Sequence, residues 1–179
     1  MRLVLCRHAA AGDTRQAAEL ADTLAGVELA AVYTSPLARA AETAQAVAAR
    51  HGLTPRVVSD LREIDLGELD GLQFEQYPAE LRAALLDTPG TVRFPGGESY
   101  EDLRARVVAA LGDIVARPDG ETVAAISHAG AIRAALATWL GVPAEASFRV
   151  DQSFAGVNVI DWIEGAPFVR LVNGTSIAR

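Results

Sequence analysis

Two of the three histidines in this sequence follow short apolar runs directly and have arginines nearby. Arg7 and His8 follow one run, His128 follows another, and Arg39 comes shortly after a third. A single histidine at the end of a strand is more often a structural residue than a functional one. Two such histidines with arginines close by favour a functional site. Together they can form a local cationic cluster for a small phosphorylated substrate, even in an acidic protein.

Arg39 gives a second indication, because it lies at the expected start of a helix. Ser35 is expected to be the N-cap and Pro36 the first helical residue, which places Arg39 in about the first turn. A cation there faces the positive end of the helix dipole, which costs about 0.3–1 kcal/mol unless an anion lies between them. The alternative is an ion pair with Glu42 on the same helix. The neighbouring strand ends favour the anion.

Other phosphate chemistries need residues at fixed positions that this sequence lacks. Cys6 cannot begin a cysteine phosphatase loop, because the arginine required six positions later is Gly12. The sequence has no Walker loop, no dinucleotide-binding glycine fingerprint and no serine elbow. The histidines also lack a metal-binding spacing such as H-E-x-x-H. We therefore expect a mechanism without a metal ion or organic cofactor.

The elements that would position these residues alternate between strands and helices. Three apolar runs are typical of strands buried on both faces of a mostly parallel sheet: Arg2–Cys6, Ala30–Thr34 and Thr122–Ser127. Apolar residues recur at helical spacing in Thr14–Leu24, Pro36–Arg50, Ser99–Ala116 and Ala131–Leu140. Gly52 and Gly141 are expected to end two of these helices in the left-handed conformation. Ligands of such sheets bind beyond the carboxyl ends of the strands, where both histidines lie.

The C-terminal part of the chain alternates more regularly between apolar and polar residues. This pattern predicts antiparallel strands at Phe148–Val150, Val157–Ile163 and Phe168–Val172. We therefore predict an α/β fold, a three-layer α/β/α sandwich with a mostly parallel central sheet. One domain is expected over residues 1–179, because that length supports one sizeable core. Leu66–Pro95 is the least regular stretch and is a candidate lid over a site.

Composition limits the partners and the location. The formal net charge is -7 and the basic residues form no run, so neither nucleic acid nor a membrane is expected as a partner. Cys6 is the only cysteine, which excludes a disulfide framework and fits a cytoplasmic location. The expected partner is a small phosphomonoester, and a homodimer is left open.

Four segments together resemble the histidine phosphatase superfamily, also called the phosphoglycerate mutase-like family. They are Leu3–Ala9 (LVLCRHA), Ser35–Ala44 (SPLARAAETA), Leu61–Leu72 (LREIDLGELDGL) and Ala125–Ala131 (AISHAGA). The motif R-H-A alone would be weak, but the four segments in this order are specific. A fifth segment, Pro95–Ser99 (PGGES), resembles the phosphatase branch of the family.

The resemblance implies a phosphoglycerate mutase-like fold and a role for each candidate residue. His8 would be the nucleophile, and Glu63 would be the general acid. Arg7, Arg39 and His128 would bind the phosphate. Arginine suits this task because its forked donors stay charged at any physiological pH. With an ordinary pKa of roughly 6.5, His8 can attack as neutral imidazole, and His128 is expected to stabilise charge as an imidazolium.

The sequence departs from the family pattern beside both histidines. Ala9 replaces the usual glycine after His8, and Ala129, an expected contact to the substrate phosphate, stands where glycine is common. The segment Gln16–Leu24 resembles a family helix but follows His8 much sooner than usual. A loop that normally helps to line the site is therefore expected to be shortened, which leaves the substrate contacts open.

Glu63 has acidic neighbours, and their charges alone do not distinguish it from them. Asp65, Glu68 and Asp70 lie close by, and such a run is usually a solvated face. The place of Glu63 in the family segment favours Glu63, with Asp65 as the reserve candidate.

We therefore predict a metal-independent phosphomonoester hydrolase that works through a phosphohistidine on a small substrate. One alternative is phosphoryl transfer of the phosphoglycerate mutase type, against which the short chain and the shortened loop argue. Another is a binding or regulatory member of the same fold that has lost turnover. The retention of both histidines, both arginines and Glu63 favours activity.

Overall fold

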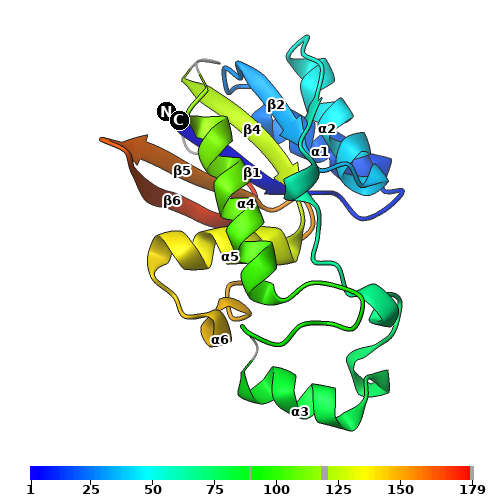
Figure 1. Ribbon diagram of the computed structural model, residues 1–179. Coiled ribbons are helices and arrows are strands. Elements are labelled where there is room, and N and C mark those ends of the chain that lie inside the picture. Colours follow the sequence, from blue (N-terminus) through cyan, green and yellow to red (C-terminus); the bar gives the residue numbers. More distant parts are fainter. Residues whose placement is uncertain (89, 118–120, 178–179) are drawn as a thin grey trace.

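The computed structural model describes residues 1–88, 90–117 and 121–177, and its centre is a mixed β-sheet (Figure 1). The described residues form six strands in the order β3-β2-β4-β1-β5-β6. Their bounds are Arg2–Arg7 (β1), Ala31–Thr34 (β2), Arg56–Val57 (β3), Thr122–Ser127 (β4), Val157–Ile163 (β5) and Ala166–Gly174 (β6). The pairs β1–β4, β4–β2 and β2–β3 are parallel, whereas β5 and β6 add antiparallel strands beside β1. The predicted mostly parallel sheet is confirmed.

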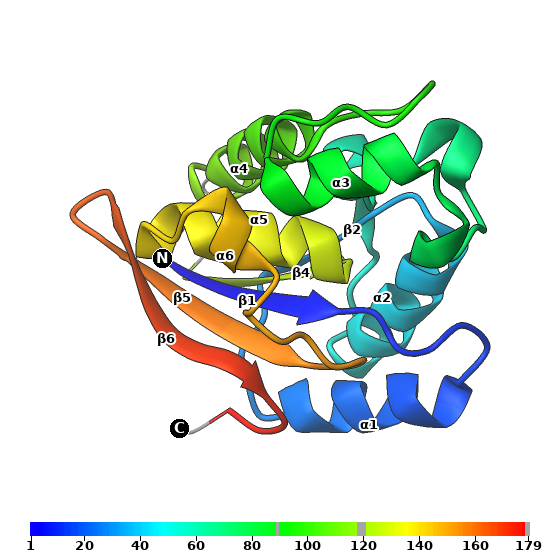
Figure 2. The same ribbon diagram turned by 90° about the horizontal axis from the view of Figure 1, so that it is seen from below.

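Helices cover both faces of the sheet and complete the predicted three layers (Figures 1 and 2). The longer helices are α1 (Thr14–Leu24), α2 (Ala38–Arg50), α3 (Ala79–Asp87), α4 (Tyr100–Val115) and α5 (Ala129–Leu140). Alternate residues of β1 face opposite layers. Leu3 and Leu5 pack with α4 and α5, whereas Val4 and Cys6 pack with α1 and α2. Because both faces are covered, β1 has no polar side, which explains its continuous apolar run.

One predicted strand, Phe148–Val150, is wrong. This segment follows the short helix α6 (Ala144–Ser147) as a turn, and the Arg149 N–H donates to the Ala146 carbonyl oxygen at 3.0 Å. The Val150 carbonyl oxygen accepts a hydrogen bond from Arg133 Nε at 2.8 Å, which replaces any strand partner. Three alternating residues were too short a pattern to distinguish a strand from such a turn.

The helix starts also differ from the sequence prediction. α2 begins at Ala38 with Leu37 as its N-cap, and Ser35 Oγ instead accepts a hydrogen bond from the Leu37 N–H at 3.2 Å. Arg39 still lies in the first turn. The predicted left-handed helix ends are confirmed, with φ of +66° at both Gly52 and Gly141.

The irregular stretch between β3 and α4 contains short helices rather than a strand. Three of them are 3₁₀ turns, η1 (Ser59–Leu61), η2 (Gly67–Leu69) and η3 (Phe74–Gln76), and α3 follows. Figure 1 shows α3 set apart from the sheet, near the N-terminal end of α4. No helix within the described ranges has the length and apolar character needed to cross a bilayer.

Candidate active site

The order of the parallel strands brings the two histidines together. Arg7 at the end of β1 lies opposite Ser127 at the end of β4, so the next residues, His8 and His128, reach the same edge of the sheet. The centroids of their rings are 4.9 Å apart. On the other side of β4, the chain leaving β2 adds Ser35, whose N–H donates to the Ile126 carbonyl oxygen at 3.0 Å. Residues far apart in the sequence thus meet at the carboxyl end of the sheet.

Two hydrogen bonds define the protonation of His8. Its Nδ1 lies 2.6 Å from the Ala9 carbonyl oxygen, and its Nε2 lies 3.2 Å from Arg39 Nε, which can only donate. The proton therefore sits on Nδ1, and Nε2 presents a lone pair. Burial lowers the pKa of His8, the bond to Ala9 opposes this effect, and the charges of Arg39 and Arg7 lower the pKa further. His8 is consequently a neutral base near pH 7, as a nucleophile must be.

Arg7 is a partly buried cation whose hydrogen bonds are incomplete. Its Nη1 donates to the Gln152 carbonyl oxygen at 2.5 Å, and its guanidinium stacks 3.7 Å from the centroid of the Phe154 ring. Its buried Nε has no partner among the described residues. Burial lowers the pKa of Arg7, although an arginine stays charged at physiological pH. A buried cation with a free donor is suited to bind an anion.

His128 is buried, and here the structure differs from the expected imidazolium. Burial, followed by electrostatic interactions with ionisable His8 and with the cations Arg39, Arg106 and Arg7, lowers the pKa of His128 to about 3. Its Nε2 lies 2.7 Å from Ser35 Oγ, and its Nδ1 has no partner in the part of the chain that is described. His128 is therefore neutral near pH 7 in this structure. One ionisable and three cationic neighbours explain why a further positive charge on His128 is unfavourable.

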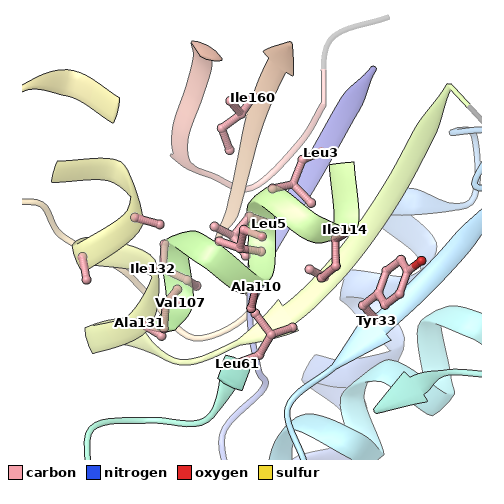
Figure 3. Close-up of a cluster of buried hydrophobic side chains, with 14 of the residues drawn as sticks. Leu3, Leu5, Tyr33, Leu61, Val107, Ala110, Ile114, Ala131, Ile132 and Ile160 are labelled. Carbon is pink, nitrogen blue, oxygen red and sulfur yellow. The ribbon is translucent and has the colours of Figure 1, made fainter. Parts of the chain in front are cut away.

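Glu63 reaches the site from the turn that follows η1. Leu61, which ends η1, packs in the buried cluster beside α4 (Figure 3), and its carbonyl oxygen accepts a hydrogen bond from Ser127 Oγ at 2.7 Å. The Glu63 carboxylate accepts hydrogen bonds from the Ile64 N–H at 3.0 Å and from the Gly130 N–H at 3.1 Å. Gly130 lies in the first turn of α5, two residues after the N-cap His128, so the carboxylate is held at the positive end of that helix.

The acidic neighbours of Glu63 point elsewhere. Asp65 is exposed, and its Oδ1 accepts a hydrogen bond from the Gly67 N–H at 2.9 Å, which closes a local turn. Glu68 and Asp70 are exposed as well. Of these four acidic residues, Glu63 alone is placed against the first turn of α5 by a hydrogen bond that the structure describes. Ala129, the first residue of α5, is half-buried, and its N–H is one of the amides without an acceptor inside the helix.

Comparison with known proteins identifies the family. Residues 11–175 match the family model of the Histidine phosphatase superfamily (branch 1). The chain belongs to the histidine phosphatase superfamily. The match begins after His8, so the placement of His8 rests on the segment Leu3–Ala9 and on the geometry above.

The proteins that resemble the chain in sequence carry different names. Bifunctional protein Rv2228c of Mycobacterium tuberculosis is 36% identical over 152 residues, which cover 82% of this chain and 41% of that protein. The chain thus spans less than half the length of this relative. Probable phosphoglycerate mutase GpmB of Salmonella choleraesuis is 31% identical over 153 residues, 84% of this chain and 71% of that protein.

A solved structure agrees with the histidine phosphatase fold. The alpha-ribazole phosphatase from Shigella flexneri superimposes with a TM-score of 0.87, covering 100% of this chain and 99% of that chain. At 22% identity this likeness shows the fold alone.

The connection between His8 and α1 is short in this member of the histidine phosphatase superfamily and is held by side chains. The Ala9 N–H donates to Thr43 Oγ1 at 3.1 Å, and the Ala10 N–H donates to Gln16 Oε1 at 2.7 Å. Asp13 caps α1 by accepting a hydrogen bond from the Gln16 N–H at 2.9 Å. A cavity of about 100 Å³ lies between this connection and α2, with Arg39 in its wall. The cavity provides space beside Arg39, a predicted phosphate ligand.

A larger hollow lies at the end of the sheet opposite the two histidines. It measures about 700 Å³ and is lined by residues at the starts of β1 and β4, including Arg2 and Thr122. Arg2 is already paired with Asp161 at 2.8 Å. We therefore place the site at the carboxyl ends of the strands, where the free donors lie. Within the described ranges, no group of His, Cys, Asp or Glu side chains is arranged to hold a metal ion.

Phe154 and the pair Arg106 and Glu98 were not among the predicted site residues. Phe154 lies over Arg7, and its ring centroid is 5.6 Å from that of His8. No spacing rule links Phe154 to these residues, because it follows them by some 145 positions. Glu98 lies within the segment PGGES, whose resemblance to the phosphatase branch implies no particular role for this residue.

Proposed function

We propose that this chain is a phosphomonoesterase that transfers the phosphoryl group of a small substrate to His8 and then to water. The observation that carries the proposal is the hydrogen bond of 3.2 Å from Arg39 Nε to His8 Nε2. This bond places the Arg39 guanidinium beside Nε2 of His8, the nitrogen that carries the lone pair. When a phosphate binds, one of its oxygens could replace His8 Nε2 as the acceptor of the Arg39 N–H.

In the first step, the lone pair of His8 Nε2 attacks phosphorus while the bond from phosphorus to the leaving oxygen breaks. Arg7, Arg39 and His128 would bind the nonbridging oxygens, and the leaving oxygen would take a proton from the Glu63 carboxyl group. The proton on His8 Nδ1 stays directed at the Ala9 carbonyl oxygen, 2.6 Å away, which stabilises the charge that the imidazole gains. The first product is an alcohol and a phosphohistidine.

In the second step, water attacks the phosphohistidine and the bond from nitrogen to phosphorus breaks. The Glu63 carboxylate, now without its proton, would accept a proton from this water. The products are inorganic phosphate and neutral His8, which restores the starting state. In this proposal Arg7 and Arg39 bind the phosphoryl group, the substrate is a monoester of a small alcohol, and no organic cofactor is needed.

Rapid quenching with a ³²P-labelled phosphomonoester tests the proposal. We expect an acid-labile, alkali-stable adduct in the native protein and none in His8→Ala, because a phosphoramidate has this stability. Chelation with EDTA should leave the activity unchanged. An alkali-labile acyl phosphate, a phosphoserine, or no adduct at all with any of a panel of phosphorylated metabolites would contradict the proposal, and the last result would favour a binding or regulatory protein.

A second candidate is phosphoglycerate mutase activity, which the 31% identity to GpmB favours. Interconversion of 2-phosphoglycerate and 3-phosphoglycerate without net release of phosphate would establish it. A cytoplasmic location, a homodimer, a lid at Leu66–Pro95 and one domain over residues 1–179 stay predictions.

A further inference from the structure

A buried ion pair joins α4 to the segment that carries Glu63. Arg106 lies on α4, and Glu98 lies just before this helix. Their side chains are only 12% and 11% exposed, and two hydrogen bonds connect them, Nη2 to Oε1 at 2.5 Å and Nε to Oε2 at 3.0 Å. Burying two charges is costly, so such a pair is weak evidence for stability by itself. Its other contacts indicate a different role.

Arg106 uses its remaining donors on the backbone around Glu63. Nη1 donates to the carbonyl oxygens of Asp60 at 2.7 Å and Arg62 at 2.9 Å, and Nη2 donates to that of Glu63 at 3.0 Å. With the two bonds to Glu98, all five N–H donors of the guanidinium have acceptors. A lysine has three donors on a single nitrogen and cannot make this planar set of bonds.

Glu98 holds the other side of the same turn. Its Oε1 accepts a hydrogen bond from the Asp65 N–H at 2.9 Å, and its own N–H donates to the Asp65 carbonyl oxygen at 3.0 Å. Burial tends to raise the pKa of Glu98, but the bonds from Arg106 and from the Asp65 N–H outweigh it and lower the pKa overall. The carboxylate is therefore ionised near pH 7. Close packing continues at Gly97, where a Cβ would lie 2.3 Å from the Asp65 carbonyl oxygen.

We propose that Arg106 and Glu98 are positioning residues for the proton donor Glu63. The pair fixes the backbone on both sides of Glu63, so that the carboxyl group stays against the Gly130 N–H. This inference rests on the proposed function. Proton transfer requires the donor within hydrogen-bond distance of the leaving oxygen, and a displacement of about 1 Å can cost about 10²-fold in rate.

The experiment compares two leaving groups in Arg106→Lys and Glu98→Gln. Single-turnover phosphorylation of His8 is measured with an alkyl phosphate, whose alkoxide needs a proton, and with p-nitrophenyl phosphate, whose phenolate does not. We expect both variants to slow the alkyl phosphate by about 10²-fold while changing the aryl phosphate much less. Arg104→Lys is the matched control, because Arg104 lies on the same helix but pairs with Glu101 at the surface. In this variant the ratio of the alkyl phosphate rate to the aryl phosphate rate should equal that of the native protein.

A second readout separates positioning from general damage to the fold. If Arg106 acts through Glu63, adding Glu63→Gln to Arg106→Lys should slow phosphorylation by the alkyl phosphate much less than Glu63→Gln slows it in the native protein. Thermal unfolding is recorded for each variant, and rates are compared well below its Tm. If Arg106→Lys does not fold, Glu98→Gln decides, since it keeps the volume of the side chain and an oxygen for the Asp65 N–H.

The failure of this inference differs from a failure of the proposed function. A native protein that forms no phosphohistidine with either substrate would remove the proposed function itself. A native protein that forms it, together with folded variants that slow both substrates equally or neither, would overturn only the positioning role of Arg106 and Glu98.

Discussion

The Glu63 carboxylate reaches α5 because residue 130 has no side chain. Glu63 Oε2 accepts a hydrogen bond from the Gly130 N–H at 3.1 Å, and a Cβ on residue 130 would lie 2.3 Å from Glu63 Oε1. Real Cβ atoms do not approach an oxygen so closely, so any larger residue must displace the carboxylate. The glycine in the segment AISHAGA is thus explained by its contact with a distant carboxylate.

Gly130→Ala should therefore impair proton donation without harming the fold. Alanine is the better helix former by about 0.8–1.0 kcal/mol, so stability should not fall by much. Hydrolysis of an alkyl phosphate should slow by about 10²-fold, because the carboxyl group has moved. The matched control is Gly112→Ala on α4, where a Cβ would meet open space, and this variant should keep full activity. Equal activity of both variants would show that the position of Glu63 does not matter.

Glu63→Gln and Asp65→Asn should separate the two candidate proton donors. An amide cannot donate an acidic proton, and general acid catalysis contributes about 10²–10⁴-fold where it is needed. In single-turnover phosphorylation of His8, Glu63→Gln should lose about this factor on an alkyl phosphate and much less on p-nitrophenyl phosphate. Asp65→Asn should slow neither substrate, because the Asp65 carboxylate accepts its hydrogen bond from the Gly67 N–H and not from α5. A loss that depends on the leaving group only in Asp65→Asn would show that the assignment is reversed.

Phe154→Leu should weaken phosphate binding through Arg7. The guanidinium lies 3.7 Å from the ring centroid, and such a contact contributes about 0.5–2 kcal/mol, or about 2-fold to 30-fold in affinity. The inhibition constant of inorganic phosphate should rise within this range. Phe168→Leu on β6 is the control, since Phe168 is 45% exposed and Phe154 is 42% exposed, yet only Phe154 contacts a proposed phosphate ligand. An unchanged inhibition constant in Phe154→Leu would remove Phe154 from the site.

Stability should fall with acid because of His128. Its pKa is about 3 in the fold, against 6.5 for the ordinary side chain, so between these values the unfolded state binds a proton that the folded state does not. Stability therefore rises with pH in this window, is fully present above the upper value and is lost as the pH falls towards the lower one. From pH 6.5 to pH 5 the loss should be about 2 kcal/mol.

Urea unfolding at pH 7 and pH 5 measures this effect in the native protein and in His128→Gln. His8 contributes with the same sign, because burial and its arginine neighbours lower its pKa as well. The free energy of unfolding should thus fall in both proteins, but by about 2 kcal/mol less in His128→Gln. The same loss in both proteins would mean that His128 titrates normally in the fold.

The sequence by itself determined the main strands and helices, and the strand ends at which the candidate site residues lie. The apolar runs before His8 and His128 predicted β1 and β4 because strands buried on both faces need apolar residues at every position. Gly52 and Gly141 marked helix ends because the left-handed conformation favours glycine. Such signals are local and can be read without knowing which segments meet. The turn at Phe148–Val150 was missed for the same reason, since Arg133, which holds it, lies in another element.

Only the tertiary structure decided which side chains touch. The sheet order places β4 between β1 and β2, and this order alone brings His8, Ser35 and His128 together. The path of the chain past α5 distinguishes Glu63 from Asp65. The Glu63 carboxylate accepts a hydrogen bond from the Gly130 N–H, whereas the Asp65 carboxylate accepts one from the Gly67 N–H. The stacking of Phe154 on Arg7 and the five hydrogen bonds of Arg106 join residues with no fixed spacing. Such contacts depend on packing between distant segments, which no periodicity along the chain encodes.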